Sequence, residues 1–325
     1  MLLGPSWLGS IEFLQKHVLS TRCALIIEEV AALGLLLHAF FKGLEIRNIT
    51  VAARRMKIAF GISVCTVLTI LGLATWVQGS GGIFWGIALA STDFGELAKI
   101  LDHLGLQQST IGQIGLNAAR FSDFGCWTAL VVALIVLRSH VFYSLIYLLP
   151  SILVVYPILS NESGVYPVLN FREEEDNAEY RFQYLTLVLA LVFLMGFLSD
   201  ACGIHFALGA FMFGVMIPNG GLKTMMVEKA EGFLSEIMMP LYFLTVGWKV
   251  DLHQISSAGW EKACMVIALA CLVKVIITLV VSWFQMPARG CLDVGLMLNT
   301  KGIFSIMVLS IGLDFKVCIF VYDVI

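Results

Sequence analysis

The sequence predicts an all-α, polytopic membrane protein, and three observations support this fold class. The chain has 325 residues, of which 59% are hydrophobic and only 13% are charged. Soluble globular domains carry about 25% charged residues, so this chain has too little polar surface to cover a water-soluble fold. Its mean hydropathy is +0.91. Its apolar residues also gather into runs of about 20, the length that a helix needs to cross a bilayer.

About ten apolar segments follow one another along the chain, and each predicts one membrane pass. The seventh is short for a spanning helix, so we expect it to be extended or tilted. The predicted passes are Cys23–Phe41, Ile58–Val77, Ile83–Leu101, Ile111–Leu137, Val141–Leu159, Tyr184–Asp200, Ile204–Ile217, Phe233–Trp248, Ala263–Phe284 and Cys291–Leu313.

The loops between these passes predict an orientation and a division of the chain. Lys and Arg concentrate in alternate loops, as the positive-inside rule requires if the loop after the first pass is cytoplasmic. The polar, acidic stretch Arg172–Glu179 then lies in the cytoplasm. We therefore predict a first membrane half at 1–159, a cytoplasmic linker at 160–183 and a second membrane half at 184–316. The net charge of −3 is too small to indicate a nucleic-acid partner.

Several ionisable residues lie inside the predicted passes. Asp123 and Lys274 each lie within a long apolar segment, and Asp93 and Glu96 lie within the third pass. A charged side chain at the bilayer centre costs about 2.5–3.5 kcal/mol on insertion scales, so such residues indicate a functional site.

Asp123 is the strongest candidate for an exchange site. Burial favours its neutral form and a nearby lysine favours the carboxylate. A carboxylate balanced between these effects can exchange a proton for a metal cation, because both bind the same negative group. The alternative is an ion pair between Asp123 and Lys274 that only packs two helices together. We favour the transport interpretation.

Two predicted passes are interrupted in the middle by polar residues and glycine. The third contains the run Ala90–Gly95 (ASTDFG), and the last contains Asn299–Gly302 (NTKG). Broken helices at matching places in two halves are typical of transporters with a binding site near the bilayer midplane. Their free backbone groups and half-helix ends can bind ions.

Several sequence motifs resemble those of one transporter family. Leu3–Gly9 reads LGPSWLG, Ser199–Phe211 reads SDACGIHFALGAF, and Leu298–Gly302 reads LNTKG, with Ile217–Gly220 and Pro240–Phe243 between the last two. In this order they resemble plant-type cation/H+ exchangers of the monovalent cation:proton antiporter-2 family, which have the sodium/proton exchanger fold. The resemblance extends to about Lys316, and the tail 317–325 does not share it.

The resemblance implies an inverted-repeat antiporter fold in which two broken helices cross. The core helices would be 58–137 and 263–313. A panel of helices at 23–41 and 184–248 would form a homodimer, and 141–159 would link the two halves. The implied activity is exchange of K+ or Na+ for H+ by alternating access, without a cofactor. The implied location is an endomembrane or the plasma membrane of a plant cell, with the lipid bilayer around a multi-pass protein.

The resemblance also implies which residues bind the ions. Ser122 and Asp123 align with the family's ion- and proton-carrying pair, in which only the aspartate matches. A later lysine matches Lys274, and Asp93 is a candidate second carboxylate. The predicted ion- and proton-binding residues are Thr92, Asp93, Ser122, Asp123, Lys274, Asn299, Thr300 and Lys301. We predict no catalytic residue and no resident metal.

The chain departs from the family pattern at the first break and beside the aspartate. Asp93, Gly95 and Glu96 replace serine, proline and valine of the family's TSFPVLARIL. Arg120 brings a positive charge to a position where the family is apolar, and it could neutralise Asp123, Asp93 or Glu96. The cation would then have to compete with it.

Two further interpretations follow. We expect the chain to be truncated at both ends relative to the family, without the final core helix and the cytosolic regulatory region. It could then be a non-transporting, degenerate antiporter fragment that acts as a membrane scaffold or dimerisation partner. A membrane enzyme is the third possibility, but the sequence contains no metalloprotease, serine-hydrolase or phosphate-binding motif, so we predict that it is not an enzyme.

Overall fold

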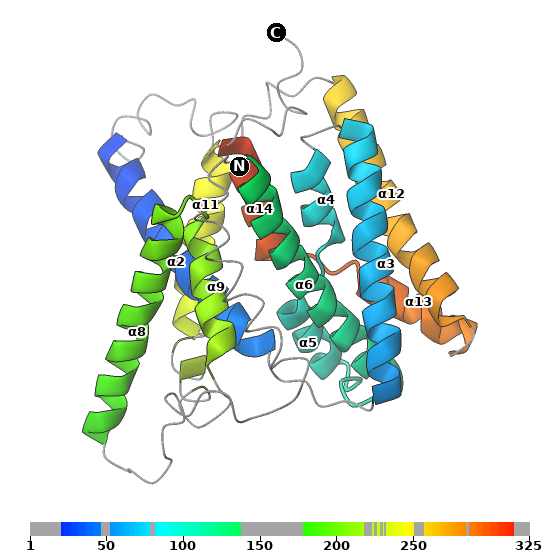
Figure 1. The fold of residues 1–325 in the computed structure, drawn as a ribbon, viewed down its shortest axis with the longest axis horizontal. Coiled ribbons are helices and arrows are strands. Elements are labelled where there is room, and N and C mark those ends of the chain that lie inside the picture. The colour runs from blue at the N-terminus through cyan, green and yellow to red at the C-terminus, as the bar shows by residue number, and fades with distance from the viewer. Residues whose placement is uncertain are drawn as a thin grey trace. The chain divides into compact units, whose positions relative to one another are not determined.

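A computed structural model describes residues 21–46, 53–78, 82–137, 178–217, 223, 226–227, 230, 232–249, 257–283 and 286–314. Within these ranges the chain is helical and contains no strand (Figure 1). The predicted all-α fold class is therefore confirmed. The predicted pass Val141–Leu159, the Leu3–Gly9 motif and the tail 317–325 lie outside the described residues.

Four of the described helices are long and apolar enough to cross a membrane. Each begins and ends within a few residues of a predicted pass, which confirms a multi-pass membrane protein. They are α2 (Thr21–Ile46), α3 (Ala53–Gln78), α6 (Thr110–Leu137) and α12 (Ser257–Ser282).

The other helices are shorter or interrupted. The third predicted pass forms α4 (Gly82–Ala90) and α5 (Phe94–His103), and the last forms α13 (Ala288–Met297) and α14 (Ile303–Asp314), so both predicted breaks are confirmed. The remaining elements are α8 (Ala178–Ala201), α9 (Phe206–Met216), and a π-helical segment η4 (Leu234–Met238) that continues into α11 (Met239–Lys249). Helix α8 begins inside the predicted linker 160–183.

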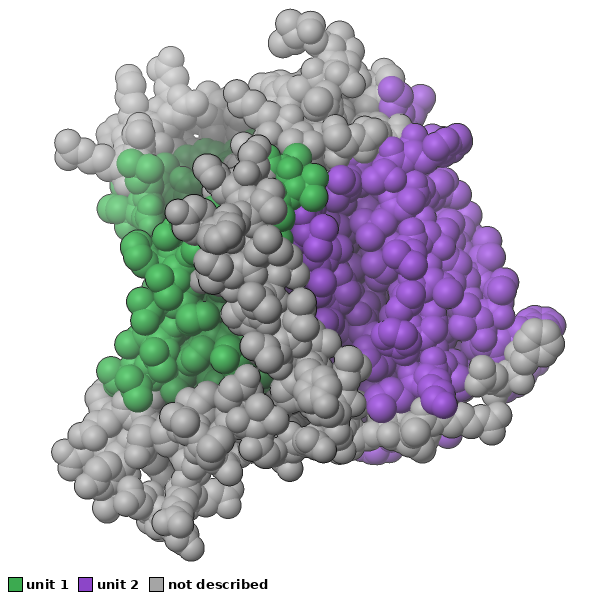
Figure 2. All heavy atoms as spheres, viewed as in Figure 1, with its two compact units in different colours: residues 1–48, 135–253 green, residues 49–134, 254–325 purple. Residues whose placement is uncertain are grey.

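The chain divides into two compact units, and each is formed by two separate stretches of the chain (Figure 2). Unit 1 consists of residues 1–48 and 135–253 and contains α2, α8, α9, η4 and α11. Unit 2 consists of residues 49–134 and 254–325 and contains α3 to α6 and α12 to α14. The assignment of a panel and a core, and the division of the chain into halves, remain predictions.

Unit 1 is held together by glycines at which helix backbones touch. A Cβ atom added to Gly43 of α2 would lie 2.2 Å from Phe211 O of α9, and one added to Gly214 would lie 2.2 Å from Phe40 O. Gly209 has the same relation to Met195 O of α8, at 2.2 Å. Small residues allow this approach between membrane helices, where packing replaces the hydrophobic driving force.

The turn between α8 and α9 explains the SDACGIHFALGAF motif. Gly203 has φ = +82°, a conformation that favours glycine. His205 then caps α9, because its Nδ1 accepts a hydrogen bond from Ala207 N at 3.3 Å. This motif therefore shapes a helix turn and a helix contact in unit 1.

Unit 2 packs four of its helices around one apolar cluster. Helices α3, α5, α6 and α13 supply its buried side chains, which include Ile62, Leu97, Ala119 and Val294. Helix α3 also packs against α4 and α12, and α14 packs against α4. The two broken passes thus lie within one unit.

We expect Gly214→Ala to lower the melting temperature of the protein in detergent by several degrees. The new methyl group would meet Phe40 O, and overpacking of this kind costs about 1–3 kcal/mol. Gly72→Ala in α3 is the matched control, because nothing lies within 4 Å of its added Cβ. Equal melting temperatures for the two variants would contradict the close contact of α2 and α9.

Candidate ion-binding site

The two breaks cross each other in unit 2 and are joined by hydrogen bonds. The first break, 91–93, separates α4 from α5, and the second, 298–302, separates α13 from α14. The bonds run from Asp93 N to Thr300 O (3.1 Å), from Thr92 Oγ1 to Leu298 O (2.8 Å), and between Ser91 Oγ and Ser305 Oγ (2.8 Å). A break in a membrane helix requires such partners, because its backbone groups cannot bond to water.

Two lysines lie at the carbonyl ends of the half-helices. Lys301 Nζ donates to Ala88 O (3.3 Å), Ser91 O (2.8 Å) and Leu89 O, at and just beyond the end of α4. A helix C-terminus leaves its last carbonyls unpaired and carries partial negative charge, so an ammonium group is favourable there.

Lys274 of α12 connects both carbonyl ends. Its side chain is fully buried, and Nζ donates to Ser91 O (2.9 Å), Thr92 Oγ1 (3.1 Å) and Leu298 O (2.8 Å). These three acceptors use all three donors of an ammonium group. No donor of Lys274 is therefore left for Asp123, and the lysine instead holds the two breaks together.

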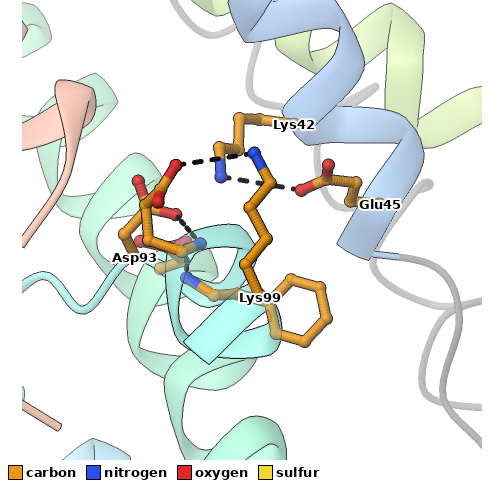
Figure 3. A network of polar contacts seen from close by, with 7 residues as sticks. Lys42, Glu45, Asp93 and Lys99 are labelled. Atoms are coloured by element: carbon orange, nitrogen blue, oxygen red, sulfur yellow. Dashed lines mark hydrogen bonds and ion pairs between the residues drawn. The ribbon is translucent and has the colours of Figure 1, made fainter. Parts of the chain in front are cut away.

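The amide ends of the half-helices face buried carboxylates. Asp93 is the N-cap of α5, and its Oδ1 accepts from Glu96 N at 3.2 Å (Figure 3). Asp123 Oδ2 accepts from Phe94 N, the first residue of α5, at 3.3 Å. Both aspartates are only 4% exposed. The partial positive charge of a helix N-terminus favours carboxylates at this place.

Asp93 also lies against the start of α14. A Cβ added to Gly302, the residue before α14, would lie 1.7 Å from Asp93 Oδ2. The carboxylate that caps α5 thus also lies beside Gly302, just before the N-terminus of α14. Gly302 is required because any side chain there would displace it.

The remaining predicted residues fill different roles around the crossing. Ser122 Oγ donates to Ala90 O at 3.0 Å and so ties α6 to the last residue of α4. Thr300 Oγ1 donates to Met297 O at 2.8 Å within its own helix end, so Thr300 reaches the other break through its carbonyl only. These two hydroxyls bond to backbone in this conformation.

Two amide oxygens are buried without a hydrogen-bond partner among the residues that the structure describes. They are Asn117 Oδ1 on α6 and Asn299 Oδ1 at the second break. Their Nδ2 groups are held by Gln113 O (2.5 Å) and Gly295 O (3.1 Å). An unsatisfied buried acceptor is costly, and a bound ion is one partner that would satisfy it.

The sequence predicts Asn299 as an ion-binding residue, but Asn117, Ser91 and Ser305 are not among the residues it predicts for the site. Asn117 is a polar residue within a spanning helix, which is the signal that could have found it. Ser91 is the first residue of the first break, and Ser305 lies three residues after the second. Their pairing depends on the crossing, which no local pattern shows.

Two broken helices that meet among apolar helices are typical of secondary ion transporters. Comparison with known proteins agrees. The family described as "Sodium/hydrogen exchanger, transmembrane" matches residues 1–319. The chain therefore belongs to the sodium/hydrogen exchanger family, and the predicted resemblance is confirmed.

The relatives are named as antiporters. The chain is 33% identical to Cation/H(+) antiporter 15 and 34% identical to Cation/H(+) antiporter 20, both of Arabidopsis thaliana, over 98% of its own length. It spans only 40% and 41% of these two proteins. It is 26% identical to Na(+)/H(+) antiporter NhaS4 of Synechocystis sp., over 98% of this chain and 82% of that protein.

We expect Gly302→Ala to disrupt the crossing. The added methyl would overlap Asp93 Oδ2 and push the carboxylate away from the helix ends, so both the melting temperature in detergent and any cation flux should fall. Gly125→Ala in α6 is the control, because its added Cβ has nothing within 4 Å. Asp93→Gly combined with Gly302→Ala should recover part of the stability. A Gly302→Ala protein that melts like the parent would refute the contact.

Proposed function

We propose that this chain exchanges a monovalent cation, K+ or Na+, for a proton across a membrane by alternating access. The observation that carries the proposal is Asp123, a buried carboxyl whose Oδ2 is bound by the first amide of α5. The relatives, named as cation/H+ and Na+/H+ antiporters, support the same activity.

The exchange needs one site that takes either ion. In the proton-loaded state, Asp123 is neutral and its burial is inexpensive. In the cation-loaded state, its carboxylate is compensated by K+ or Na+, together with the partial positive charge of the α5 N-terminus. Neutral oxygens would complete the coordination of the cation. Asn117 Oδ1 and Asn299 Oδ1 are the available acceptors.

The other predicted residues would support this exchange. Lys274 and Lys301 keep the carbonyl ends of the breaks satisfied while the ion changes. Thr92 accepts from Lys274 and donates to Leu298 O, and so keeps the breaks in register. Asp93 has one of two roles. It either supplies a fixed negative charge beside two helix N-termini or acts as a second carboxylate in the exchange. All these groups lie in unit 2, so they can move as one body.

The wider setting is proposed from the relatives. We place the protein in an endomembrane or the plasma membrane of a plant cell, as a homodimer formed through its panel helices. One Arabidopsis relative carries "chloroplastic" in its name. The relatives are transporters, and the absence of an enzymatic activity in this chain remains a prediction. Their names do not favour the alternative of a non-transporting scaffold.

We expect Asp123→Asn to abolish exchange. The test is K+- or Na+-driven proton movement in liposomes that contain the 325-residue chain. Asparagine keeps the size of the side chain but cannot alternate between a proton and a cation, so flux should fall to the level of empty liposomes. Asp102→Asn, an exposed acid at the other end of α5, is the control and should transport normally.

Full flux in Asp123→Asn would show that another group carries the ions. Absence of flux in the parent and in all variants would favour the scaffold alternative.

A further inference from the structure

Arg120 is a charged residue of unit 2 that the exchange mechanism does not use. It lies on α6 three residues before Asp123, and residues at this spacing occupy the same face of a helix with their Cβ atoms about 5–6 Å apart. Its side chain is half-buried. A guanidinium group keeps its positive charge at any pH at which proteins are studied.

One residue of α5 fixes both Arg120 and Asp123. The guanidinium Cζ of Arg120 lies 4.1 Å from the centroid of the Phe94 ring, which is the geometry of a cation–π interaction. The backbone N–H of the same Phe94 donates to Asp123 Oδ2. Phe94 is itself buried. Its ring and its amide therefore hold a permanent cation close to the carboxylate that exchanges ions.

The other acidic residues near Arg120 have separate roles. Glu96 is half-exposed and forms an ion pair with Lys99 at 3.7 Å. Asp93 caps α5 and contacts the start of α14. Asp123 is the acid that shares the helix face of Arg120.

We infer that Arg120 is a tethered cation that competes with the transported cation for Asp123 and so sets the apparent cation affinity of the exchanger. The inference rests on the proposed exchange at Asp123. Arg120 acts through Asp123 and is therefore a positioning residue. A second positive charge beside a buried carboxylate weakens the binding of any further cation, since like charges repel in a medium of low dielectric constant.

The test compares the KM and the maximal rate of cation-driven proton flux in liposomes. We expect Arg120→Leu to lower the KM for K+ or Na+ by about three- to tenfold with little change in the maximal rate. Removal of Arg120 also strengthens proton binding to Asp123. The assay is therefore run at a pH high enough that a further increase in pH no longer raises the flux. Arg120→Lys keeps the charge and should resemble the parent.

Two further variants separate this role from a structural one. Arg289→Leu removes an exposed arginine of α13 and should leave the KM unchanged. Phe94→Leu removes the ring that holds the guanidinium and should lower the KM in the parent. It should have no further effect when Arg120 is already leucine. An equal effect of Phe94→Leu in both backgrounds would overturn the inference.

The outcomes distinguish this inference from the proposed function. Flux that depends on Asp123 but has the same KM with and without Arg120 would overturn the inference and leave the exchange intact. Flux absent from the parent and gained in Arg120→Leu would support the inference, with Arg120 excluding the cation.

Cation binding can also be measured without transport. The melting temperature of the purified protein is followed as the concentration of KCl or NaCl rises, with choline chloride as the control salt. Arg120→Leu should respond at lower salt. If this variant and the parent respond at the same salt concentration, the competition is refuted.

Discussion

The structure of unit 2 depends on one constraint, which is that a helix broken inside a membrane must satisfy its own exposed backbone groups. The chain meets this constraint by sorting charges. Ammonium groups of Lys274 and Lys301 lie at the carbonyl ends, around Ser91 O and Leu298 O. The carboxylate of Asp93 lies at the amide ends, against Glu96 N and Gly302. Each charge is placed where the helix dipole favours it, so the breaks and the buried charges stabilise each other.

This arrangement satisfies the helix ends of both breaks within the protein itself. An ion that enters the site meets backbone oxygens already bound by two lysines and amide groups already bound by carboxylates. In the proposed exchange, the group that binds the ion is Asp123, whose Oδ2 accepts from the first amide of α5.

Much of this could be predicted from local sequence. Polar and glycine residues in the middle of apolar passes indicated both breaks, and the cost of charge in a membrane indicated Asp123 and Lys274. What could not be predicted was which segments meet. The pairing of Ser91 with Ser305, the approach of Gly302 to Asp93 and the ring of Phe94 beneath Arg120 join residues far apart in the chain. The sequence indicates Lys274 as a partner of Asp123, but its three donors are used by two backbone carbonyls and a hydroxyl at the breaks.

The departures from the family pattern at the first break form a consistent set. Aspartate at position 93 provides an N-cap for α5, a position at which aspartate is among the preferred residues. That cap adds a negative charge to a region whose other buried carboxylate is Asp123. Arg120 adds a positive charge on α6, three residues before Asp123. A substitution that strengthens a helix end would otherwise increase the charge that the site must hold in the membrane. In the proposed exchange, Arg120 thus limits the negative charge that a cation meets at Asp123. It does so with a guanidinium that is fixed on Phe94 and cannot leave with the transported ion.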